Sequence, residues 1–526
     1  MGILTTILLM PLVAMVLVML TPRGKDDVVR GIAALSTFAS MLLSMKMYYD
    51  FLNLEYALRA NWQFVERLPW FPDLGIAYIV GVDGLNAPMV LLTGILAFAS
   101  SVVSFGIKER VKEYYALALA SIAGVFGIFM SLDLFFFILF YEMASVPLYF
   151  LLGIWGSVPK SGPRKVSIEY AATKLILYLQ LGGGLAFLGI LALWWNVTVP
   201  GATPGALMHT FDLTAIMAEL GKNPLPHAVQ TWLFPVMFIG FAVEGGFVPF
   251  HTWLPDGHSS APTALSMLLA GVLLKMGSYG VLRLAIAPMP DGARTWMPFF
   301  MVLATVNVVY GALCALRQVD IKYLIAYSSV SHMGVVFLGL GCSSLGANNV
   351  MGVEGAVFQM FSHGVVTAML FGLAGYVYEK THTRNIEEMG GLAFRMPFLA
   401  ATFTMAALAS LGLPGLSGFV AEALVFFGLY RQNQVLTIVT VLALVVTATY
   451  LLRCVQKIFF GPSAEAHGHG DGHAHEKLTD IGGFQKVGPV VLGLTSLVVG
   501  ICPSILLNAM HPSVVHLLST LGGVQQ

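Results

Sequence analysis

The sequence predicts an all-α polytopic membrane protein with about fourteen transmembrane helices. Hydrophobic residues make up 57% of the 526 residues and charged residues only 10%, whereas soluble domains carry about 25% charged residues. The mean hydropathy is +0.81. Backbone polar groups cannot stay unpaired in lipid, so the long apolar segments should be helices. The sequence shows none of the alternating ten-residue segments that would indicate a membrane β-barrel.

A helix needs about 20 mostly apolar residues to cross a membrane. The segments that meet this requirement are 3–21, 29–50, 80–105, 113–131, 133–156, 169–195, 229–250, 259–285, 296–316, 322–341, 352–379, 397–430, 434–460 and 485–509. We interpret the segment 3–21 as the first span rather than a signal peptide, because it lacks a basic start and a small-residue cleavage site.

Lysine and arginine residues between the spans concentrate in alternate loops, beginning with those that contain Arg23 and Lys108. Because basic loops stay on the cytoplasmic side, this bias predicts that both termini lie on the outer side. The expected segments are N-terminal helices 1–3, a first repeat of helices 4–8, a second repeat of helices 9–13, and a His-rich loop with the final helix. Their ranges are 1–110, 111–290, 291–460 and 461–526.

Several function classes find no support in the sequence. Its 27 basic and 27 acidic residues balance, so nucleic-acid binding has no electrostatic basis. The four cysteines stand singly, and neither a GxGxxG motif nor a P-loop occurs, so no cofactor or metal site is expected on this chain. The segment EAHGHGDGHAHEK, residues 465–477, is expected to be a solvated loop rather than a metal site.

Titratable residues near the middle of predicted spans are the main functional signal. A charge at a helix centre costs at least about 2.5–3.5 kcal/mol, and such residues normally face protein or water. Any one of them could be a structural ion pair. A series of them along the whole protein favours a proton relay, because protons move by short hops between titratable groups. The candidates are Glu142, Lys174, Glu244, Lys275, His332, His363 and Glu422.

Two spans contain residues that should break a helix. Gly245, Gly246 and Pro249 interrupt the seventh span, and Pro414 and Gly415 interrupt the twelfth. Paired broken helices at corresponding places are typical of transporters built from inverted repeats. Because the two spans are five apart, spans 4–8 and 9–13 are predicted to be two inverted five-helix repeats. Two ordinary proline kinks are the alternative.

Three polar residues at the ends of the spans are expected to have structural roles. His251 and His258 flank the motif TWLPDG and are expected to cap and connect the seventh and eighth helices. Asp83 precedes the third helix and fits a helix-start role.

Five motifs resemble the antiporter-like membrane subunits of respiratory complex I. They are YEMASVPLYFLLGIWG, HTWLPDGHSSAPTALS, IKYLIAYSSVSHMG, SHGVVTAMLFGLAGYVYEKTHTRNI and LGLPGLSGFVAEALVFF. The likeness runs through all the predicted spans and is greatest to the NuoM-type chain. A NuoL-type chain is disfavoured, because only about 17 residues follow the predicted last span.

The resemblance implies fourteen helices, inverted repeats and proton pumping coupled to distant quinone reduction. It assigns family roles to Glu142, Lys275 and Glu422, and to His332 and His363.

Two further positions bear on the resemblance. Lys174 stands where the family's sixth helix often has a lysine, whereas Glu244 replaces the lysine usual on the seventh. The carboxylates of Glu142 and Glu244 would then be neighbours. Either the two would share one proton, or one of them would pair with Lys275.

The sequence therefore predicts a proton-translocating subunit of a complex I-type NADH-quinone oxidoreductase without a redox centre of its own. Other subunits would carry FMN, iron–sulfur clusters and quinone, with NADH or another electron donor. NuoL-type and NuoN-type neighbours and lipid are the expected partners, in a bacterial inner membrane. A subunit of a cation/proton antiporter or membrane-bound hydrogenase, and a non-pumping structural paralogue, are the alternatives.

Overall fold

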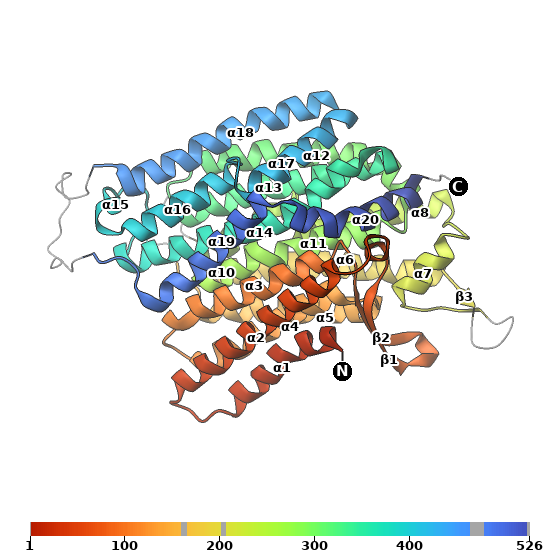
Figure 1. Ribbon diagram of the computed structural model, residues 1–526, viewed down its shortest axis with the longest axis horizontal. Helices are drawn as coiled ribbons and strands as arrows, with labels where there is room; N and C mark the ends of the chain where they lie inside the picture. The colour runs from red at the N-terminus through yellow and green to blue at the C-terminus, as the bar shows by residue number, and fades with distance from the viewer. Residues whose placement is uncertain (1, 159–165, 201–206, 463–477, 523–526) are drawn as a thin grey trace.

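The computed structural model describes residues 2–158, 166–200, 207–462 and 478–522. Helices run roughly along the long axis of the molecule, and both chain termini lie toward the same end of the array (Figure 1). We call this the terminal end. The opposite end holds α15 (Figure 1). The predicted helical architecture is confirmed, since nearly all of the elements are helices.

The helices of the first half are α1 Ile3–Leu20, α2 Asp26–Leu52, η1 Tyr56–Ala60, η2 Pro72–Leu74, α3 Ala87–Val103, η3 Ser104–Gly106, α4 Val111–Met130, α5 Leu134–Trp155, α6 Ile168–Asn196, α7 Leu213–Leu220, α8 His227–Glu244, η4 Phe250–Thr252, α9 Trp253–Ser260, α10 Thr263–Leu268, η5 Leu269–Leu273, α11 Leu274–Gly280 and η6 Val281–Ile286.

The helices of the second half are α12 Pro290–Leu316, α13 Ile321–Gly341, η7 Cys342–Asn349, α14 Val350–Thr381, α15 Leu392–Arg395, α16 Pro397–Ser410, α17 Ser417–Gln432, α18 Gln434–Val455, η8 Gln456–Phe460, η10 Gly483–Lys486, α19 Val487–Ile501 and α20 Ser504–Gly522. The strands are β1 Gln63–Phe71, β2 Ile76–Val82, β3 Val199–Pro200 and β4 Leu207–Met208.

Aspartates begin several of the long helices. The Asp133 carboxylate accepts hydrogen bonds from two backbone N–H groups at the start of α5. Asp320 does the same for α13, and Asp26 and Asp27 lie in the first turn of α2. An acidic side chain at a helix start pairs with N–H groups that have no partner within the helix. Asp133 and Asp320 therefore cap the starts of α5 and α13.

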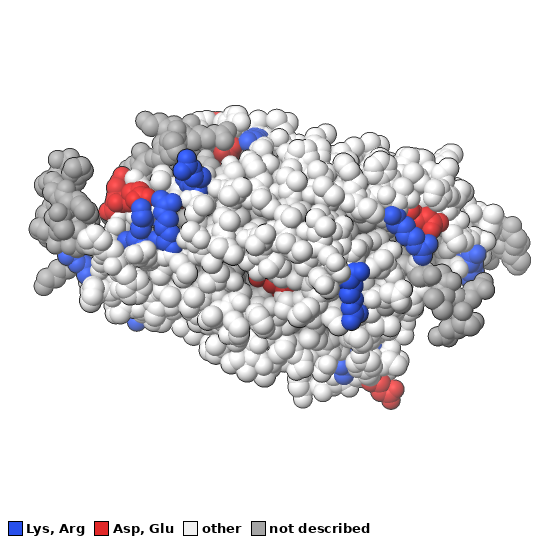
Figure 2. Space-filling model, turned by 90° about the horizontal axis from the view of Figure 1, so that it is seen from above, with Lys and Arg blue, Asp and Glu red and all other residues white. Residues whose placement is uncertain are grey.

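Among the described residues, twelve helices are long and apolar enough to cross a membrane. They differ sharply in burial. All of the most apolar window is buried in α14 and in the helix from α10 to η6, but only 33% of it in α1 and α18. Figure 2 shows a broad uncharged band between the charged side chains at the two ends, with one small acidic patch inside it. The outer helices therefore offer an apolar surface to lipid.

The seventh predicted span is broken, as expected. Helix α8 ends at Glu244, Gly246 has a φ of +70°, and the chain resumes as η4 and α9. Asn307 of α12 satisfies the backbone groups that this break leaves free. Its side-chain oxygen accepts from the Val248 N–H at 2.5 Å, and its amide donates to the carbonyls of Gly246 at 3.1 Å and Val330 at 3.0 Å.

The twelfth predicted span is broken as well. Helix α16 ends at Ser410 and α17 begins at Ser417, with positive φ angles at Gly412 (+78°) and Gly415 (+92°). Only glycine adopts such angles without strain. Helix α8 starts near the terminal end and α16 at the opposite end (Figure 1). Opposed broken helices are what an inverted repeat requires, and the repeat itself remains a prediction.

Two predicted boundaries are wrong. The third span does not begin near residue 80, because residues 76–82 pair with 63–71 as the antiparallel hairpin β1–β2 and α3 begins at Ala87. The last span does not end near residue 509. Pro503 interrupts it, since a proline has no N–H to donate, and α20 then continues to Gly522.

The substitution Asn307→Leu tests the support of the first break. We expect it to destabilise the protein by about 2–5 kcal/mol, because each buried backbone group left unpaired costs about 1–3 kcal/mol. The measurement is the thermal unfolding midpoint of the purified protein in detergent. Asn223→Leu is the control, since the Asn223 amide bonds only to the exposed side chain of Glu219. Equal shifts for the two variants would contradict a special role for Asn307.

Candidate functional site

Lys275 lies near the middle of the α10–η6 helix, which is one of the two most buried helices among the described residues. The helix is π-helical at Leu269–Leu273 and Val281–Ile286, on either side of the lysine, and π-helical turns are frequent at functional sites. The Lys275 ammonium group donates to the carbonyl of Ala270 and lies 2.7 Å from Nδ1 of His363 on α14. The amine of Lys275 and Nδ1 of His363 share this hydrogen bond, and which of the two donates depends on the tautomer of the imidazole ring.

A second histidine continues the series toward α17. The rings of His363 and His332 are 5.6 Å apart. His332, on α13, lies 3.3 Å through Nδ1 from a carboxylate oxygen of Glu422 and 3.1 Å through Nε2 from the hydroxyl of Ser410. Ser410 ends α16 at the second break, so this break and the histidines belong to one site.

These contacts join Lys275, His363, His332 and Glu422 into one series across three helices and the second half of the broken span. Each of the four residues is at most 4% exposed. Sequence spacing had placed them near the middle of separate spans, and the structure brings them together. We call this set the central series. The side chains differ in chemistry, but each can gain and lose a proton.

Glu142 and Glu244 lie outside the central series. Glu142 of α5 accepts a hydrogen bond from Gln180 of α6 at 2.6 Å, near the surface of this chain. Glu244 is buried at the end of α8, and neither of its carboxylate oxygens has a hydrogen-bond partner among the described residues. Tyr141 and Glu142 are its electrostatic neighbours, and the buried hydroxyl of Tyr141 lies close to its carboxylate.

The end of α8 therefore holds a buried acid beside a second acid. In the described part of the chain, no ion pair joins Lys275 to Glu142 or Glu244. The ammonium group of Lys275 turns instead toward Ala270 and His363.

Lys174 belongs to a separate cluster at the second half of the broken span. Its ammonium group forms an ion pair with Asp256 of α9 at 2.8 Å. The hydroxyl of Tyr323, on α13, donates to the other Asp256 oxygen at 3.1 Å. Side-chain exposure is 13% for Lys174 and 1% for Asp256. Lys174 is therefore held by Asp256 of α9. Glu142 is contacted instead by Gln180, another residue of α6.

The histidines that were expected to cap helices are buried instead. The ring of His251 packs edge-to-face against Tyr310 with ring centroids 5.1 Å apart, and the ring of His258 stacks on Phe371 at 4.8 Å. Their ring nitrogens have no hydrogen-bond partner among the described residues. His258 lies close enough to Lys275 and His363 for their charges to interact. In the sequence, the signal for these buried histidines is the polar motif HTWLPDGH directly after a helix break.

Two cations that contact the end of α9 are also buried. Lys322 donates to the carbonyl of Ala261 at 2.7 Å, and Arg384 to that of Ser259 at 2.7 Å. Both groups therefore satisfy carbonyls at the end of α9, where a positive charge is favourable. The helix-start role expected for Asp83 is wrong, because the N-cap residue of α3 is Asn86. The Asp83 carboxylate accepts from the N–H groups of Leu85 and Asn86 in the turn before α3, and it pairs with Arg283.

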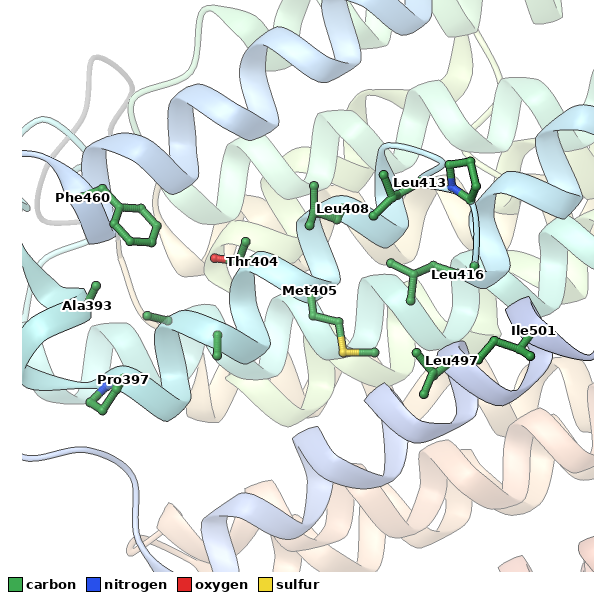
Figure 3. A pocket seen from close by; sticks show the side chains of 14 residues that line it. Ala393, Pro397, Thr404, Met405, Leu408, Leu413, Leu416, Phe460, Leu497 and Ile501 are labelled. Carbon is green, nitrogen blue, oxygen red and sulfur yellow. The ribbon is translucent and has the colours of Figure 1, made fainter.

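The second break borders an apolar pocket of about 700 Å³. Figure 3 shows side chains from α16, the Leu413–Leu416 turn and α19 around it. The two breaks therefore differ, since Asn307 holds the first in place and open space adjoins the second. In the described residues, no group of three His, Cys, Asp or Glu side chains is placed to hold a metal ion. The His-rich segment 467–475 lies outside those residues.

Comparisons with known proteins agree with this geometry. A family model described as NADH:quinone oxidoreductase/Mrp antiporter, TM, matches residues 131–447. The chain is 36% identical over 522 residues to NADH-quinone oxidoreductase subunit M of Rhodobacter capsulatus, covering 98% of this chain and 96% of that protein. It is 38% identical over 465 residues to NAD(P)H-quinone oxidoreductase chain 4 2 of Microcystis aeruginosa, covering 87% and 79%.

Solved structures give the same family. A chain of respiratory complex I from Thermus thermophilus with bound NADH superposes with a TM-score of 0.84 at 28% identity, covering 99% of this chain and 100% of that one. A chain of the Mrp complex from Dietzia sp. DQ12-45-1b shares the fold, with a TM-score of 0.79 at 19% identity over 99% and 100% of the two chains. The chain therefore belongs to the NADH:quinone oxidoreductase/Mrp antiporter transmembrane family, as a chain of the subunit M, or chain 4, type.

Proposed function

We propose that this chain translocates protons as a membrane-arm subunit of a complex I-type NADH-quinone oxidoreductase. The observation that carries the proposal is the central series, in which Lys275, His363, His332 and Glu422 are joined by contacts of 2.7–5.6 Å. Protons move by short hops between titratable groups, and charged groups at membrane depth mark such paths. A structural ion pair needs two residues, whereas this series extends across several helices.

The proposed path has an entrance and an exit. Lys275 receives a proton from the first half of the protein, the two histidines pass it on, and Glu422 releases it. The pocket beside the second break leaves room for α16 and α17 to change their bend, which favours Glu422 as the moving end. Asn307 holds the first break rigid, so the geometry around Glu244 should change less.

Glu142, Glu244 and Lys174 are proposed to feed the central series. Glu244 is buried beside the hydroxyl of Tyr141 and the carboxylate of Glu142, and no cation pairs with it among the described residues. Two interacting carboxylates titrate as a pair. Lys174 would act through Asp256 on α9, and the buried His258 connects that helix with Lys275 and His363. The family-like pair of Glu142 with a lysine is replaced here by a pair of acids.

The redox reaction is assigned to other subunits. NADH or another donor, FMN, iron–sulfur clusters and quinone would all be bound there, and quinone reduction would be coupled to this chain from a distance. Glu142 lies at the surface near the middle of α5. A carboxylate at that depth needs protein or water around it, which supports a neighbouring membrane subunit of the NuoL or NuoN type at this face.

The proposed setting is a bacterial inner membrane with both termini outside. The bias of basic residues in the loops supports this orientation, and both termini lie at one end of the helix array (Figure 1). The four segments 1–110, 111–290, 291–460 and 461–526 are proposed as the functional divisions, with two inverted repeats in the middle and fourteen spans in all, once the two broken helices are counted.

An antiporter or hydrogenase subunit is the second candidate, because its fold would be the same. Co-purification with quinone-reducing peripheral subunits separates it from the first. A structural paralogue without pumping is disfavoured, since Lys275, His363, His332 and Glu422 are all retained and in contact.

Lys275→Ala should abolish most proton pumping, because it removes the amine at one end of the central series. The measurement is the dye-reported pH gradient in proteoliposomes containing the purified complex during quinone reduction. Assembly is checked by the presence of all subunits. Lys46→Ala is the control, since Lys46 makes an exposed ion pair with Asp50 on α2. Pumping by Lys275→Ala near the parent level would remove it from the path.

Glu422→Gln should block coupled turnover, because it keeps the shape of the side chain and removes its titration. Glu422→Lys restores a titratable group and should retain more activity than Gln. Both are compared by quinone-reduction rate with and without an uncoupler. If the parent, Gln and Lys forms turn over equally, Glu422 is a structural partner of His332 only.

Glu244→Gln should damage pumping much more than Glu244→Lys, because only lysine leaves a titratable group beside the first break. Glu219→Gln, an exposed change on α7, serves as control. The coupled-carboxylate interpretation is wrong if the Gln variant pumps like the parent while the Lys variant does not.

A further inference from the structure

A polar network closes the helix of Lys275 at the terminal end. Lys275, Tyr279 and Arg283 follow one another at intervals of four residues, which places them on one face of the helix. Arg283 is 7% exposed and donates through Nε to the Tyr279 hydroxyl at 3.3 Å. Tyr279 is packed against the rings of Phe129 and Phe137, at 5.4 and 6.5 Å. Direct passage from Lys275 toward this end is therefore filled by an aromatic side chain and then a cation.

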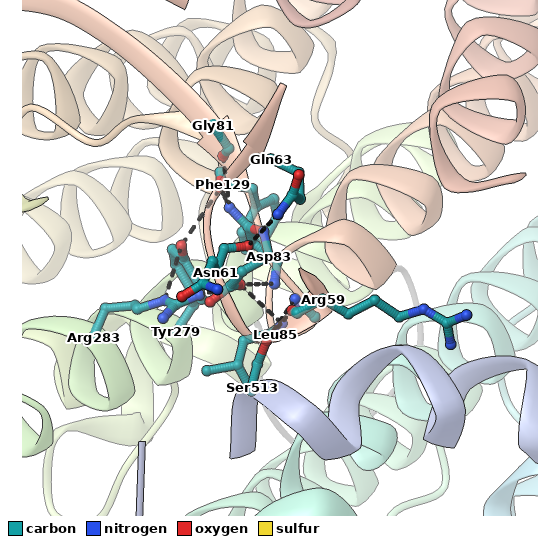
Figure 4. A network of polar contacts seen from close by, with 12 residues as sticks. Arg59, Asn61, Gln63, Gly81, Asp83, Leu85, Phe129, Tyr279, Arg283 and Ser513 are labelled. Atoms are coloured by element: carbon teal, nitrogen blue, oxygen red, sulfur yellow. Dashed lines mark hydrogen bonds and ion pairs between the residues drawn. The ribbon is translucent and has the colours of Figure 1, made fainter. Parts of the chain in front are cut away.

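The Arg283 guanidinium is held from three directions. It forms an ion pair with Asp83, lies 4.6 Å from the ring of Trp62, and lies 5.6 Å from the ring of Tyr279. Figure 4 shows Asp83 between Arg283 and the backbone that leads to Leu85. Asp83 is 4% exposed. The cation is thus fixed in a buried place rather than directed into solvent.

Other elements lock the position of Asp83. Asn86 accepts from the Asp83 N–H at 2.7 Å and donates to the carbonyl of Phe129 at 2.6 Å. The Gly84 N–H donates to the hydroxyl of Ser513 on α20 at 2.9 Å, and that hydroxyl donates to the carbonyl of Arg59. A side chain at Gly84 would collide with the backbone of α20. The last helix and η1 therefore fix the network that carries the ion pair.

A small vestibule lies directly beyond the ion pair. Its volume is about 280 Å³, and Asp83 and Arg283 form part of its wall. The remaining wall comes from three separate parts of the chain, represented by Trp62, Thr214 on α7 and His516 on α20. All three parts belong to the terminal end (Figure 1). The vestibule thus approaches the helix of Lys275 and stops at Arg283.

We propose that Arg283, held by Asp83, is an electrostatic seal that prevents protons on Lys275 from passing straight into the vestibule. A fixed cation repels protons and other cations at a constriction, as arginines do in selective pores. The seal rests on the proposed role of Lys275. It adds a direction to that role, because a proton on Lys275 then leaves only through the two histidines and Glu422. Arg283 does not carry the proton in this scheme.

The test measures passive proton leak through the assembled complex in proteoliposomes without electron donor or quinone. A pH gradient is imposed, and its collapse is followed with an entrapped dye. Arg283→Gln should leak about tenfold faster than the parent. Removal of a nearby unit charge should lower the electrostatic barrier by at least the ~1.4 kcal/mol that corresponds to a tenfold change in rate. Arg283→Lys and Asp83→Asn keep a cation and should leak within about twofold of the parent.

Matched variants separate charge from packing. Arg294→Gln removes a half-exposed arginine that pairs with Asp291, and it should leave the leak unchanged. If Arg283→Gln does not assemble, Arg283→Met provides an uncharged side chain of similar length. A leak in Asp83→Asn and Arg283→Lys as large as in Arg283→Gln would show that packing, not charge, closes the path, and would overturn the seal.

The double variant Lys275→Ala/Arg283→Gln connects the seal with the path. Its leak should fall back to the parent level, because the proton carrier behind the seal is missing. A leak that persists in the double variant would overturn the connection. Pumping by Lys275→Ala alone tests the proposed function independently. If that variant loses pumping while Arg283→Gln does not leak, the seal fails and the proposed function stands.

Discussion

Charges and unpaired backbone groups cannot face lipid, and the whole arrangement depends on this constraint. The helices that carry Lys275 and His363 are completely buried over their most apolar windows, whereas α1 and α18 are covered over only a third. Outer helices therefore act as a covering that keeps lipid from the titratable groups. The same covering brings these groups within reach of one another, so burial and function have one physical origin.

The two helix breaks satisfy this constraint in different ways. At the first, a single side chain, Asn307, pairs with three backbone groups and ties α8 to α12 and α13. At the second, glycines relieve strain and an apolar pocket adjoins the turn. A rigid break and one with space beside it suit different tasks, because only the second can change its bend without repacking the core.

Glu244 is a buried acid with a second acid, Glu142, beside it. Within the described residues, the structure supplies no cation to compensate its charge. Lys275 is engaged with His363 and Lys174 with Asp256. Glu244 thus lies beside Tyr141 and Glu142 without a cation among the described residues. Burying its carboxyl group costs less free energy when that group carries a proton.

The sequence by itself determined the membrane class, the positions of both breaks and the titratable residues, because hydropathy, glycine–proline patterns and charges within apolar segments are local signals. Only the tertiary structure decided that Lys275 meets His363, that Lys174 pairs with Asp256, and that Arg283, Lys322 and Arg384 are buried. The hairpin β1–β2 and the continuation of the last helix as α20 were likewise decided there. Helical spacing fixes which residues share a face, but not which neighbouring helix that face meets, and burial depends on the neighbour.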